Sequence, residues 1–97
     1  MFRIECLGRL VKEVELSFSK GKGLAIARFT IAINESKDKV VYHNFTAFGK
    51  AAEILANHGT KGKMIFIEDA TIVNSSYEKN GEKVYTKDLV VKTFKFC

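Results

Sequence analysis

The fold is decided by residues 24–48, which read LAIARFTIAINESKDKVVYHNFTAF. In residues 24–34 every odd position carries an apolar side chain, whereas Arg28, Thr30 and Asn34 at even positions are polar. Successive side chains of a β-strand point to opposite faces, so an apolar period of two is typical of a strand with one buried face. The pattern therefore predicts a strand whose odd residues face the core and whose polar even residues face water.

A second strand is predicted over residues 40–48, after a short charged loop at residues 35–39. Tyr42 and Phe48 have the same parity, so both rings emerge on one face of this strand, with polar side chains between them. The opposite parity is more continuously apolar and suits the core better; its apolar members are Val41, Phe45 and Ala47. We therefore predict that the rings of Tyr42 and Phe48 lie outside the core.

Turn residues and periodicity predict the remaining elements. Three further strands cover residues 2–18, 64–73 and 84–94. Gly8 predicts a bend or bulge within the first of them, and the Lys-Gly-Lys-Gly turn at residues 20–23 joins that strand to the next in a hairpin. Residues 50–58 have the apolar spacing of a short helix, and the Asn-Gly pair at residues 80–81 is a strong hairpin signal. The chain is therefore expected to consist mainly of strands.

The order of these elements is three meandering strands, one helix and a two-strand hairpin. A single helix cannot cover both faces of an open sheet, so a small closed barrel fits this order better. We predict an all-β chain, a five-stranded Greek-key barrel of the OB-fold type, with the helix between strands three and four. A chain of 97 residues has room for one hydrophobic core, so residues 1–97 are expected to form a single domain.

The composition favours a folded, basic protein. Sixteen Lys and Arg against eleven Asp and Glu give a net charge of +5, and hydrophobic residues make up 46% of the chain. Excess positive charge attracts polyanions such as nucleic acids, although many basic proteins bind none. A barrel this small buries a limited fraction of its surface, so self-association would add stability and a homo-oligomer is expected.

The sequence contains no predicted membrane span and no secretory signal. No apolar run approaches the roughly 18 residues that a spanning helix needs, and the N-terminus has no apolar signal-peptide region. Cys6 and Cys97 lie at opposite ends of the chain and have no metal-ligand spacing. We interpret Cys6 as a small core residue and Cys97 as an exposed thiol, both reduced, in a cytoplasmic, nucleoid-associated protein.

Motifs for catalysis or metal binding are missing from the sequence. The two histidines, His43 and His58, have no Cys, Asp or Glu at metal-ligand spacing. Neither the phosphate-binding G-x-x-x-x-G-K-[ST] loop nor the G-x-S-x-G nucleophile motif occurs, and the acidic residues show no paired arrangement. We therefore expect a binding protein that is not an enzyme and takes no metal or cofactor.

Exposed aromatic rings in a basic protein favour the binding of single-stranded nucleic acid. Every base has a π-face that can stack on an aromatic side chain, while Lys and Arg contact the phosphates. Basic residues flank Tyr42 and Phe48 in sequence, namely Lys20 and Lys22 at the first hairpin tip, Arg28 and Lys50. The second hairpin carries Lys79, Lys83 and Lys87. Scattered surface lysines usually serve solubility alone, but two basic hairpins beside an aromatic sheet predict a groove that follows a phosphate backbone.

Several segments, in the family's order, resemble the bacterial and phage single-stranded DNA-binding proteins. They are hydrophobic-x-hydrophobic-x-G-R-L at 4–10, V-E-L-S-F at 14–18, A-x-x-x-F-T-x-A-x-N at 25–34, F-G-K-x-A-E at 48–53, K-G-x-x-x-x-I-E at 61–68, Y-E-K-N-G at 77–81 and V-Y-T-x-x-L-V-V at 84–91. No single segment is diagnostic, but together they are specific. They cover nearly the whole chain.

The resemblance implies an OB-fold homotetramer, a dimer being the alternative, with single-stranded DNA wrapped over its outer surface. The family's stacking aromatics correspond to Tyr42 and Phe48, its phosphate-contacting basic residue to Lys50, and the lysine of its K-G turn to Lys61. His43 matches a histidine of the family's subunit interface; a buried core histidine is the other interpretation. The implied function is sequence-tolerant binding and protection of single-stranded DNA during replication, recombination and repair.

The chain also departs from the family pattern. A third stacking aromatic is expected at Lys37, in a shortened loop, and a fourth at Ser76, whereas the aromatic here is Tyr77. On a regular strand that shift turns the ring to the other face, so Tyr77 stacks only if a bulge or a shifted hairpin restores its direction. Asp69 stands where the family commonly has glycine. The family's acidic-tipped tail, which recruits replication and repair proteins, does not follow Cys97, so the sequence is either a core domain or a tailless member.

Two other functions compete with single-stranded DNA binding. The first is an RNA-binding or primosome-type accessory OB-fold that also contacts protein partners, which competition between matched DNA and RNA oligonucleotides would separate. The second is a structural oligomerisation module whose aromatic face meets protein. Size-exclusion behaviour that is insensitive to both salt and oligonucleotide would favour the second.

Overall fold

The computed structural model describes residues 3–97, in which six strands and one helix follow one another. In chain order they are β1 (Ile4–Leu10), β2 (Glu15–Phe18), β3 (Ala25–Ser36), β4 (Lys39–Phe48), α1 (Lys50–His58), β5 (Met64–Lys79) and β6 (Glu82–Phe96). The start of the first strand expected at Phe2 lies outside the described residues. The predicted positions of the helix and of the last four strands are confirmed, with somewhat longer strands.

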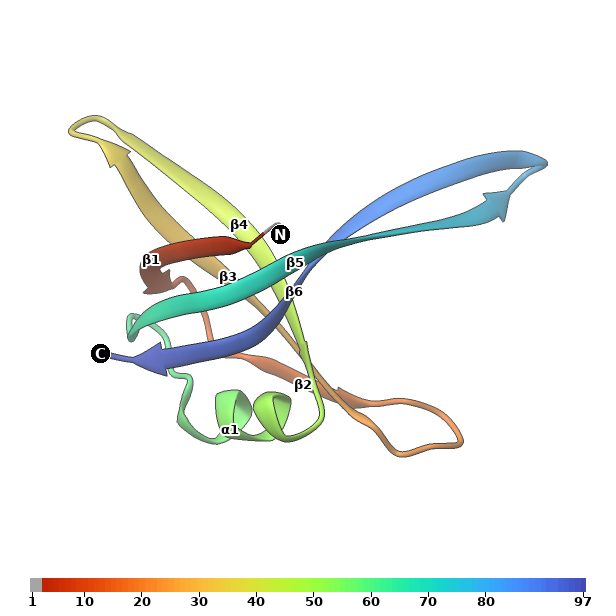
Figure 1. Cartoon of the computed structure of the whole chain (residues 1–97), viewed down its shortest axis with the longest axis horizontal. Helices are drawn as coiled ribbons and strands as arrows, with labels where there is room; N and C mark the ends of the chain where they lie inside the picture. The colour runs from red at the N-terminus through yellow and green to blue at the C-terminus, as the bar shows by residue number, and fades with distance from the viewer. Residues whose placement is uncertain (1–2) are drawn as a thin grey trace.

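The strands close into a barrel (Figure 1). Around it the hydrogen-bonded order is β1, β5, β6, β4 and β3, and β1 returns to β3 through the pairs Arg9↔Ala32 and Leu10↔Ile31. These neighbours are antiparallel except for β4 and β6, which run parallel. With β1 and β2 taken as one bent strand, this is the predicted five-stranded barrel of the OB-fold, with α1 between its third and fourth strands.

The first strand is broken, contrary to the single long strand expected. Leu10 pairs with Ile31 and Glu15 pairs with Arg28, so the four residues 11–14 lie opposite only two residues of β3. A regular ladder cannot accommodate this mismatch, because each residue of one strand must face one residue of its partner. β2 therefore begins only after residue 14.

Gly8 lets β1 approach β3 closely and does not bend the strand. A Cβ atom at this position would overlap the side chain of Ile31 and lie 2.5 Å from the carbonyl oxygen of Ala32. The irregular register of β1 lies at its other end, between Ile4 and Cys6. The bend or bulge predicted at Gly8 is therefore wrong, and this glycine is required by packing.

The β3–β4 and β5–β6 hairpins extend beyond the barrel as arms (Figure 1). The turn between β3 and β4 is reduced to Lys37 and Asp38, which makes the charged loop shorter than expected. The turn between β5 and β6 consists of Asn80 and Gly81, whose φ angles of 53° and 79° are both positive. Tight two-residue hairpin turns require such angles, so the Asn-Gly prediction is confirmed.

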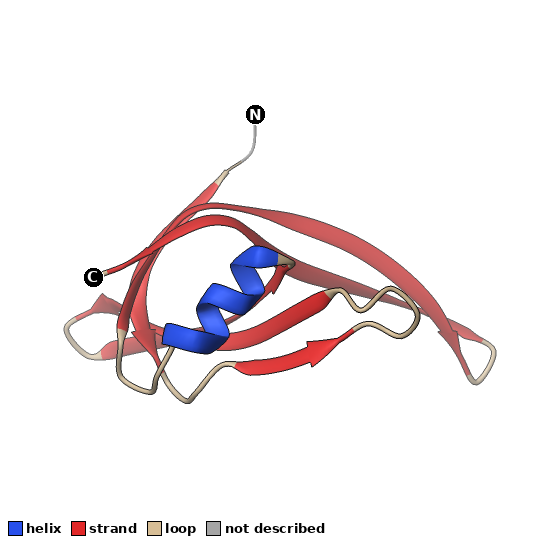
Figure 2. Ribbon diagram, turned by 90° about the horizontal axis from the view of Figure 1, so that it is seen from below, coloured by secondary structure: helices blue, strands red, loops and turns tan. Residues whose placement is uncertain are grey.

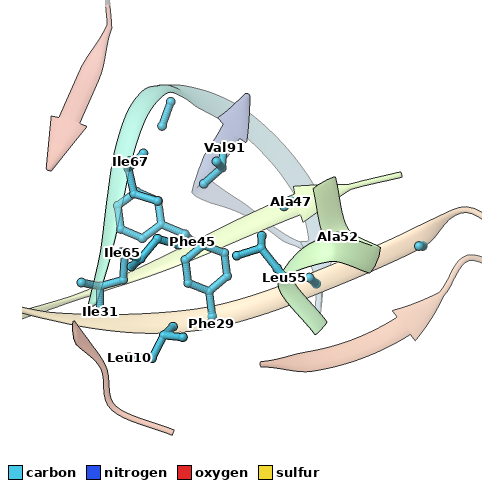
Figure 3. Packing of buried hydrophobic residues seen from close by; sticks show 13 residues of the cluster. Leu10, Phe29, Ile31, Phe45, Ala47, Ala52, Leu55, Ile65, Ile67 and Val91 are labelled. Atoms are coloured by element: carbon cyan, nitrogen blue, oxygen red, sulfur yellow. The ribbon is translucent and has the colours of Figure 1, made fainter. Parts of the chain in front are cut away.

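The core fills the barrel with the inward side chains of the strands (Figure 3). The rings of Phe29 and Phe45 stack at its centre, with centroids 5.7 Å apart. The buried members are Leu10, Ala25, Ala27, Phe29, Ile31, Phe45, Ala47, Ala52, Leu55, Ile65, Ile67, Ala70 and Val91. The odd residues of β3 from Ala25 to Ile31 are all buried, so the predicted inner face of this strand is confirmed.

The helix α1 lies across one opening of the barrel (Figure 2). It inserts Ala52 and Leu55 into the core, and both side chains are fully buried. Covering an open barrel end with an amphipathic helix removes apolar surface from water without adding another strand. Within residues 3–97, no helix has the length and apolarity needed to span a membrane.

Candidate nucleic-acid interface

The outer face of β3 and β4 carries the two predicted aromatic rings. Tyr42 is 64% exposed and Phe48 is 42% exposed, whereas Phe45 and Ala47 between them are buried. The alternation along β4 therefore places the rings in water as predicted. Six residues at about 3.3 Å each separate the two rings by about 20 Å along the strand.

Polar side chains fill the space between the two rings. Opposite each other on β3 and β4 are the pairs Arg28↔Thr46 and Thr30↔Asn44. The Thr30 hydroxyl donates a hydrogen bond to the Asn44 side-chain oxygen at 2.6 Å. Because that oxygen accepts this bond, the amide NH₂ of Asn44 is left to donate to a ligand.

A groove with a volume of about 330 Å³ crosses this polar face. It spans four strands and the segment before β2, and its lining is Lys12, Glu15, Arg28, Phe29, Thr30, Asn44, Phe45, Thr46, Lys87 and Asp88. We call it the polar groove. It brings together two predicted phosphate contacts, Arg28 from β3 and Lys87 from β6, that are 59 residues apart in the chain.

The charges of the polar groove are partly paired. Lys12 forms an ion pair with Glu15 at 3.2 Å, and both side chains are more than half exposed, so the pair contributes little stability. The ion pairs formed within residues 3–97 do not include Arg28, Lys87 or Asp88. Arg28 and Lys87 therefore present unpaired positive charge to any anion that enters the groove.

The other predicted cations lie outside the polar groove. Lys20 and Lys22 are exposed at the turn between β2 and β3, and Lys79 is exposed beside the tip of the β5–β6 hairpin. Lys61 is exposed in the turn after α1, next to Gly62, whose carbonyl accepts a hydrogen bond from Arg9. These lysines extend a basic surface around the molecule and do not converge on one point.

Lys50 lines a second groove, of about 550 Å³, between α1 and the end of β6. This groove is mainly apolar and includes Ile54, which is 39% exposed, and the edge-to-face pair Phe94 and Phe96. The Lys63 ammonium lies 4.6 Å from the centroid of the Phe96 ring. Lys50 is thus separated from the polar groove, which its position directly after Phe48 and Gly49 did not suggest.

His43 is exposed, so its interpretation as a buried core histidine is wrong. It has the inward parity of Phe45 and Ala47, but it lies nearer the start of β4, where it pairs with Ile31. Its position at a subunit interface stays a prediction. Cys6 packs against the core but is only partly buried, and burial raises the pKa of its thiol; Cys97 is exposed.

The β5–β6 hairpin carries two exposed tyrosines. Tyr77 is 51% exposed and pairs with Val84, and Tyr85 is 74% exposed and pairs with Ser76. The register is regular from Ala70 to Lys79, without a bulge that would turn Tyr77 to the face of Ser76. Tyr85 was not among the site residues predicted from the sequence. The Asn-Gly turn could have indicated it, because a two-residue turn fixes which residues face each other across the hairpin. Counting back from Asn80 and Gly81 places Tyr85 opposite Ser76.

The residues described by the structure do not suggest a metal centre. Within residues 3–97, no group of three or more His, Cys, Asp or Glu side chains is arranged to hold a metal ion. The site consists instead of exposed rings, amide and hydroxyl groups, and cations. These groups suit the stacking of bases and the binding of phosphates.

The strand order and the position of α1 define an OB-fold barrel, a fold whose sheet face and neighbouring loops bind oligonucleotides in many proteins. The polar groove lies on the corresponding face. The chain belongs to the single-strand binding protein family, whose model matches residues 1–97.

Bacterial relatives support this membership. A protein of Clostridium perfringens named single-stranded DNA-binding protein is 40% identical over 99% of this chain and 65% of its own length. A protein of the same name from Clostridium tetani is 33% identical over 99% of this chain and 70% of its own length. The chain thus spans about two thirds of the length of these relatives.

Proposed function

We propose that this protein binds single-stranded DNA with little sequence preference, across the outer face of β3 and β4. The observation that carries the proposal is the exposure of Tyr42 and Phe48 on either side of a groove that presents Arg28 and Lys87. Bases stack on the rings, the phosphates contact the cations, and the Asn44 amide donates hydrogen bonds. Stacking is independent of base identity because every base has a π-face.

The DNA path extends beyond the polar groove. Further contacts are proposed for exposed lysines on the hairpins, α1 and the turn after it: Lys20, Lys22, Lys50, Lys61 and Lys79. These residues lie on different sides of the barrel, so one strand reaches them only by wrapping around it. Each neutralised phosphate releases counterions, which makes the affinity strongly dependent on salt.

The biological role that fits this binding is protection of unpaired DNA during replication, recombination and repair. We propose that residues 1–97 form one domain, that the protein acts by binding without catalysis, and that it works in the cytoplasm as a homotetramer. The names of the two relatives support single-stranded DNA as the ligand. The small core supports self-association, because a 97-residue barrel buries a limited fraction of its surface.

The variant Phe48→Ala tests the proposal. Loss of one stacking ring should weaken binding to a fluorescently labelled oligo(dT) by about 1–3 kcal/mol, measured by anisotropy. The matched control is Phe18→Ala, which removes an exposed ring on β2. Phe18 pairs with Ala25 whereas Phe48 pairs with the next residue, Ile26, so the two rings are on opposite faces of the sheet. The affinity of the control variant should equal that of the unmodified protein.

Two outcomes would contradict the proposal. One is equal loss of affinity in both Phe variants, and the other is equal affinity of the unmodified protein for duplex and single-stranded DNA. Competition with an RNA oligonucleotide of matched sequence separates a preference for DNA from one for RNA, because a protein adapted to RNA contacts the 2′-hydroxyl. Thermal unfolding of each variant shows whether the fold is intact.

A further inference from the structure

The β5–β6 arm, residues 72–89, has two different faces. Its pairing is regular from Ala70↔Val91 to Lys79↔Glu82, so residues directly opposite each other share a face and neighbours in sequence do not. Tyr85 and Ser76 therefore lie on one face, and Tyr77 and Val84 lie on the other. The two tyrosines of the arm cannot contact the same base.

The surroundings of Tyr85 leave one side of its ring open. The Lys83 ammonium lies 5.6 Å from the ring centroid and covers part of the other side. The residue directly opposite, Ser76, is small, and the ring is 74% exposed, the highest value among the exposed large hydrophobic residues described. The aromatic contacts within residues 3–97 join other rings, Phe29 to Phe45 and Phe94 to Phe96. A flat ligand can therefore reach Tyr85 without displacing another ring.

The net charge differs between the two faces of the arm. Glu78 lies opposite Lys83 on the Tyr85 face, and Lys79 lies opposite Glu82 on the Tyr77 face, so these charges are balanced across the strands. The remaining charged residue is Lys87 on the Tyr85 face. On the Tyr77 face it is Asp88, opposite Val73. A polyanion is therefore attracted to the Tyr85 face and repelled from the other within the reach of these charges, about 8 Å at physiological salt.

The polar groove borders both faces of the arm where the arm begins, because Lys87 and Asp88 both line it. The cation at this point, Lys87, is on the Tyr85 face. Tyr85 lies on the same face of β6, two residues nearer the hairpin tip and about 7 Å from Lys87 along the strand. The arm projects away from the barrel (Figure 1), so a DNA strand that leaves the groove at Lys87 can continue along it.

We infer that Tyr85, Lys83 and Lys87 form a nucleotide subsite, in which one base stacks on the open side of the Tyr85 ring and a phosphate contacts the lysine ammonium groups. This inference rests on the proposed function, because it adds a subsite to the same DNA path. It assigns a stacking role to Tyr85 and makes the arm an extension of the polar groove.

The sequence offers a direct test, because the chain contains no tryptophan and three tyrosines, Tyr42, Tyr77 and Tyr85. In the variant Y42F/Y77F, Tyr85 is the sole source of tyrosine fluorescence, and phenylalanine keeps a stacking ring at the other two positions. Addition of oligo(dT) should quench this emission. The matched variant Y42F/Y85F reports on Tyr77 alone and should be quenched less, since that ring lies on the acidic face.

Binding is followed in parallel by the anisotropy of a labelled oligo(dT), which separates the two possible failures. If Y42F/Y77F binds the oligonucleotide and its emission is unchanged, the Tyr85 subsite is wrong and the proposed function stands. If the unmodified protein binds no oligonucleotide, the proposed function itself is wrong. A sugar-phosphate chain without bases should bind weakly through the lysines and cause no quenching; quenching by that chain would overturn stacking.

Affinity provides an independent measurement of the same subsite. Y85A should weaken binding of a long oligo(dT) roughly 5- to 150-fold, the range expected for one stacked base, and Y85F should restore most of the affinity. The thermal midpoint of Y85A should stay close to that of the unmodified protein, because the ring is exposed. Equal affinities of Y85A and the unmodified protein would overturn the inference.

Discussion

Arg28 carries a positive charge that is available to contact a phosphate. It lines the polar groove from β3, and the ion pairs of the described residues do not include it. Arg3, which precedes β1, forms an ion pair with Glu5 at 3.1 Å and does not line the groove. The two arginines therefore differ in their availability to a phosphate.

The variant Arg28→Ala should reduce the salt dependence of DNA binding. Loss of one phosphate contact lowers the slope of log affinity against log salt concentration by about 0.7 for a single strand. The measurement is a set of oligo(dT) titrations at several salt concentrations. Arg3→Ala should leave the slope unchanged, and a slope that also stays constant in Arg28→Ala would show that Arg28 does not contact phosphate.

Strand β4 divides its side chains between the core and the solvent. Phe45 and Ala47 are buried in the barrel, and the alternating residues Tyr42 and Phe48 face water. The division follows from the period of two of a β-strand, which gives each face its own chemistry. The two faces should therefore respond differently to mutation.

Phe45→Ala should lower the free energy of unfolding by about 3–5 kcal/mol, because it leaves a cavity beside Phe29 in the core. Tyr42→Ala should change that free energy by at most about 0.5 kcal/mol and should instead weaken oligo(dT) binding. Urea unfolding and anisotropy titrations measure the two effects. Large destabilisation by Tyr42→Ala would mean that its ring packs against protein, for example in an oligomer.

Two properties of the whole molecule act on self-association in opposite directions: its exposed apolar side chains and its positive net charge. Exposed large apolar side chains occur on several elements, among them Leu7 on β1, Phe18 on β2 and Val40 on β4. Burial of such side chains between subunits removes apolar surface from water and favours self-association. The positive net charge of +5 opposes them, more strongly at low salt.

We predict a homotetramer with a mass of about 44 kDa, four times the 10.9 kDa of one chain. Light scattering after size exclusion measures this mass directly, at several salt concentrations and with and without oligo(dT). A mass of one or two chains under all conditions would contradict the tetramer. The variant His43→Glu, compared with His58→Glu at the end of α1, tests the predicted interface: the first should lower the mass and the second should not.

Local features of the sequence were sufficient for the last four strands and for the orientation of the two rings on β4. The alternation of residues 24–34 and 40–48 predicted which side chains are buried, because parity along a strand depends only on neighbouring residues. The Asn-Gly turn predicted the β5–β6 hairpin for the same reason, since its positive φ angles are a local property of those two residues.

Features that depend on contacts between distant strands required the three-dimensional structure. The break after Leu10 arises because the chain must leave β5 and continue along β3, and Gly8 is needed only because β1 approaches Ile31. Likewise, His43 has the parity of the buried residues Phe45 and Ala47 but is exposed. Its exposure depends on how far the barrel covers β4, which parity along the strand could not indicate.

The residues of the candidate interface divide in the same way. Residue types and strand parity identified Tyr42, Phe48 and Arg28, because each is exposed by the geometry of its own strand. The meeting of Arg28 with Lys87, the separation of Lys50 from both, and the acidic and basic faces of the β5–β6 arm depend on barrel closure and on the register between strands. Closure brings residues from distant parts of the chain together, and the alternation within one strand carries no information about its partners.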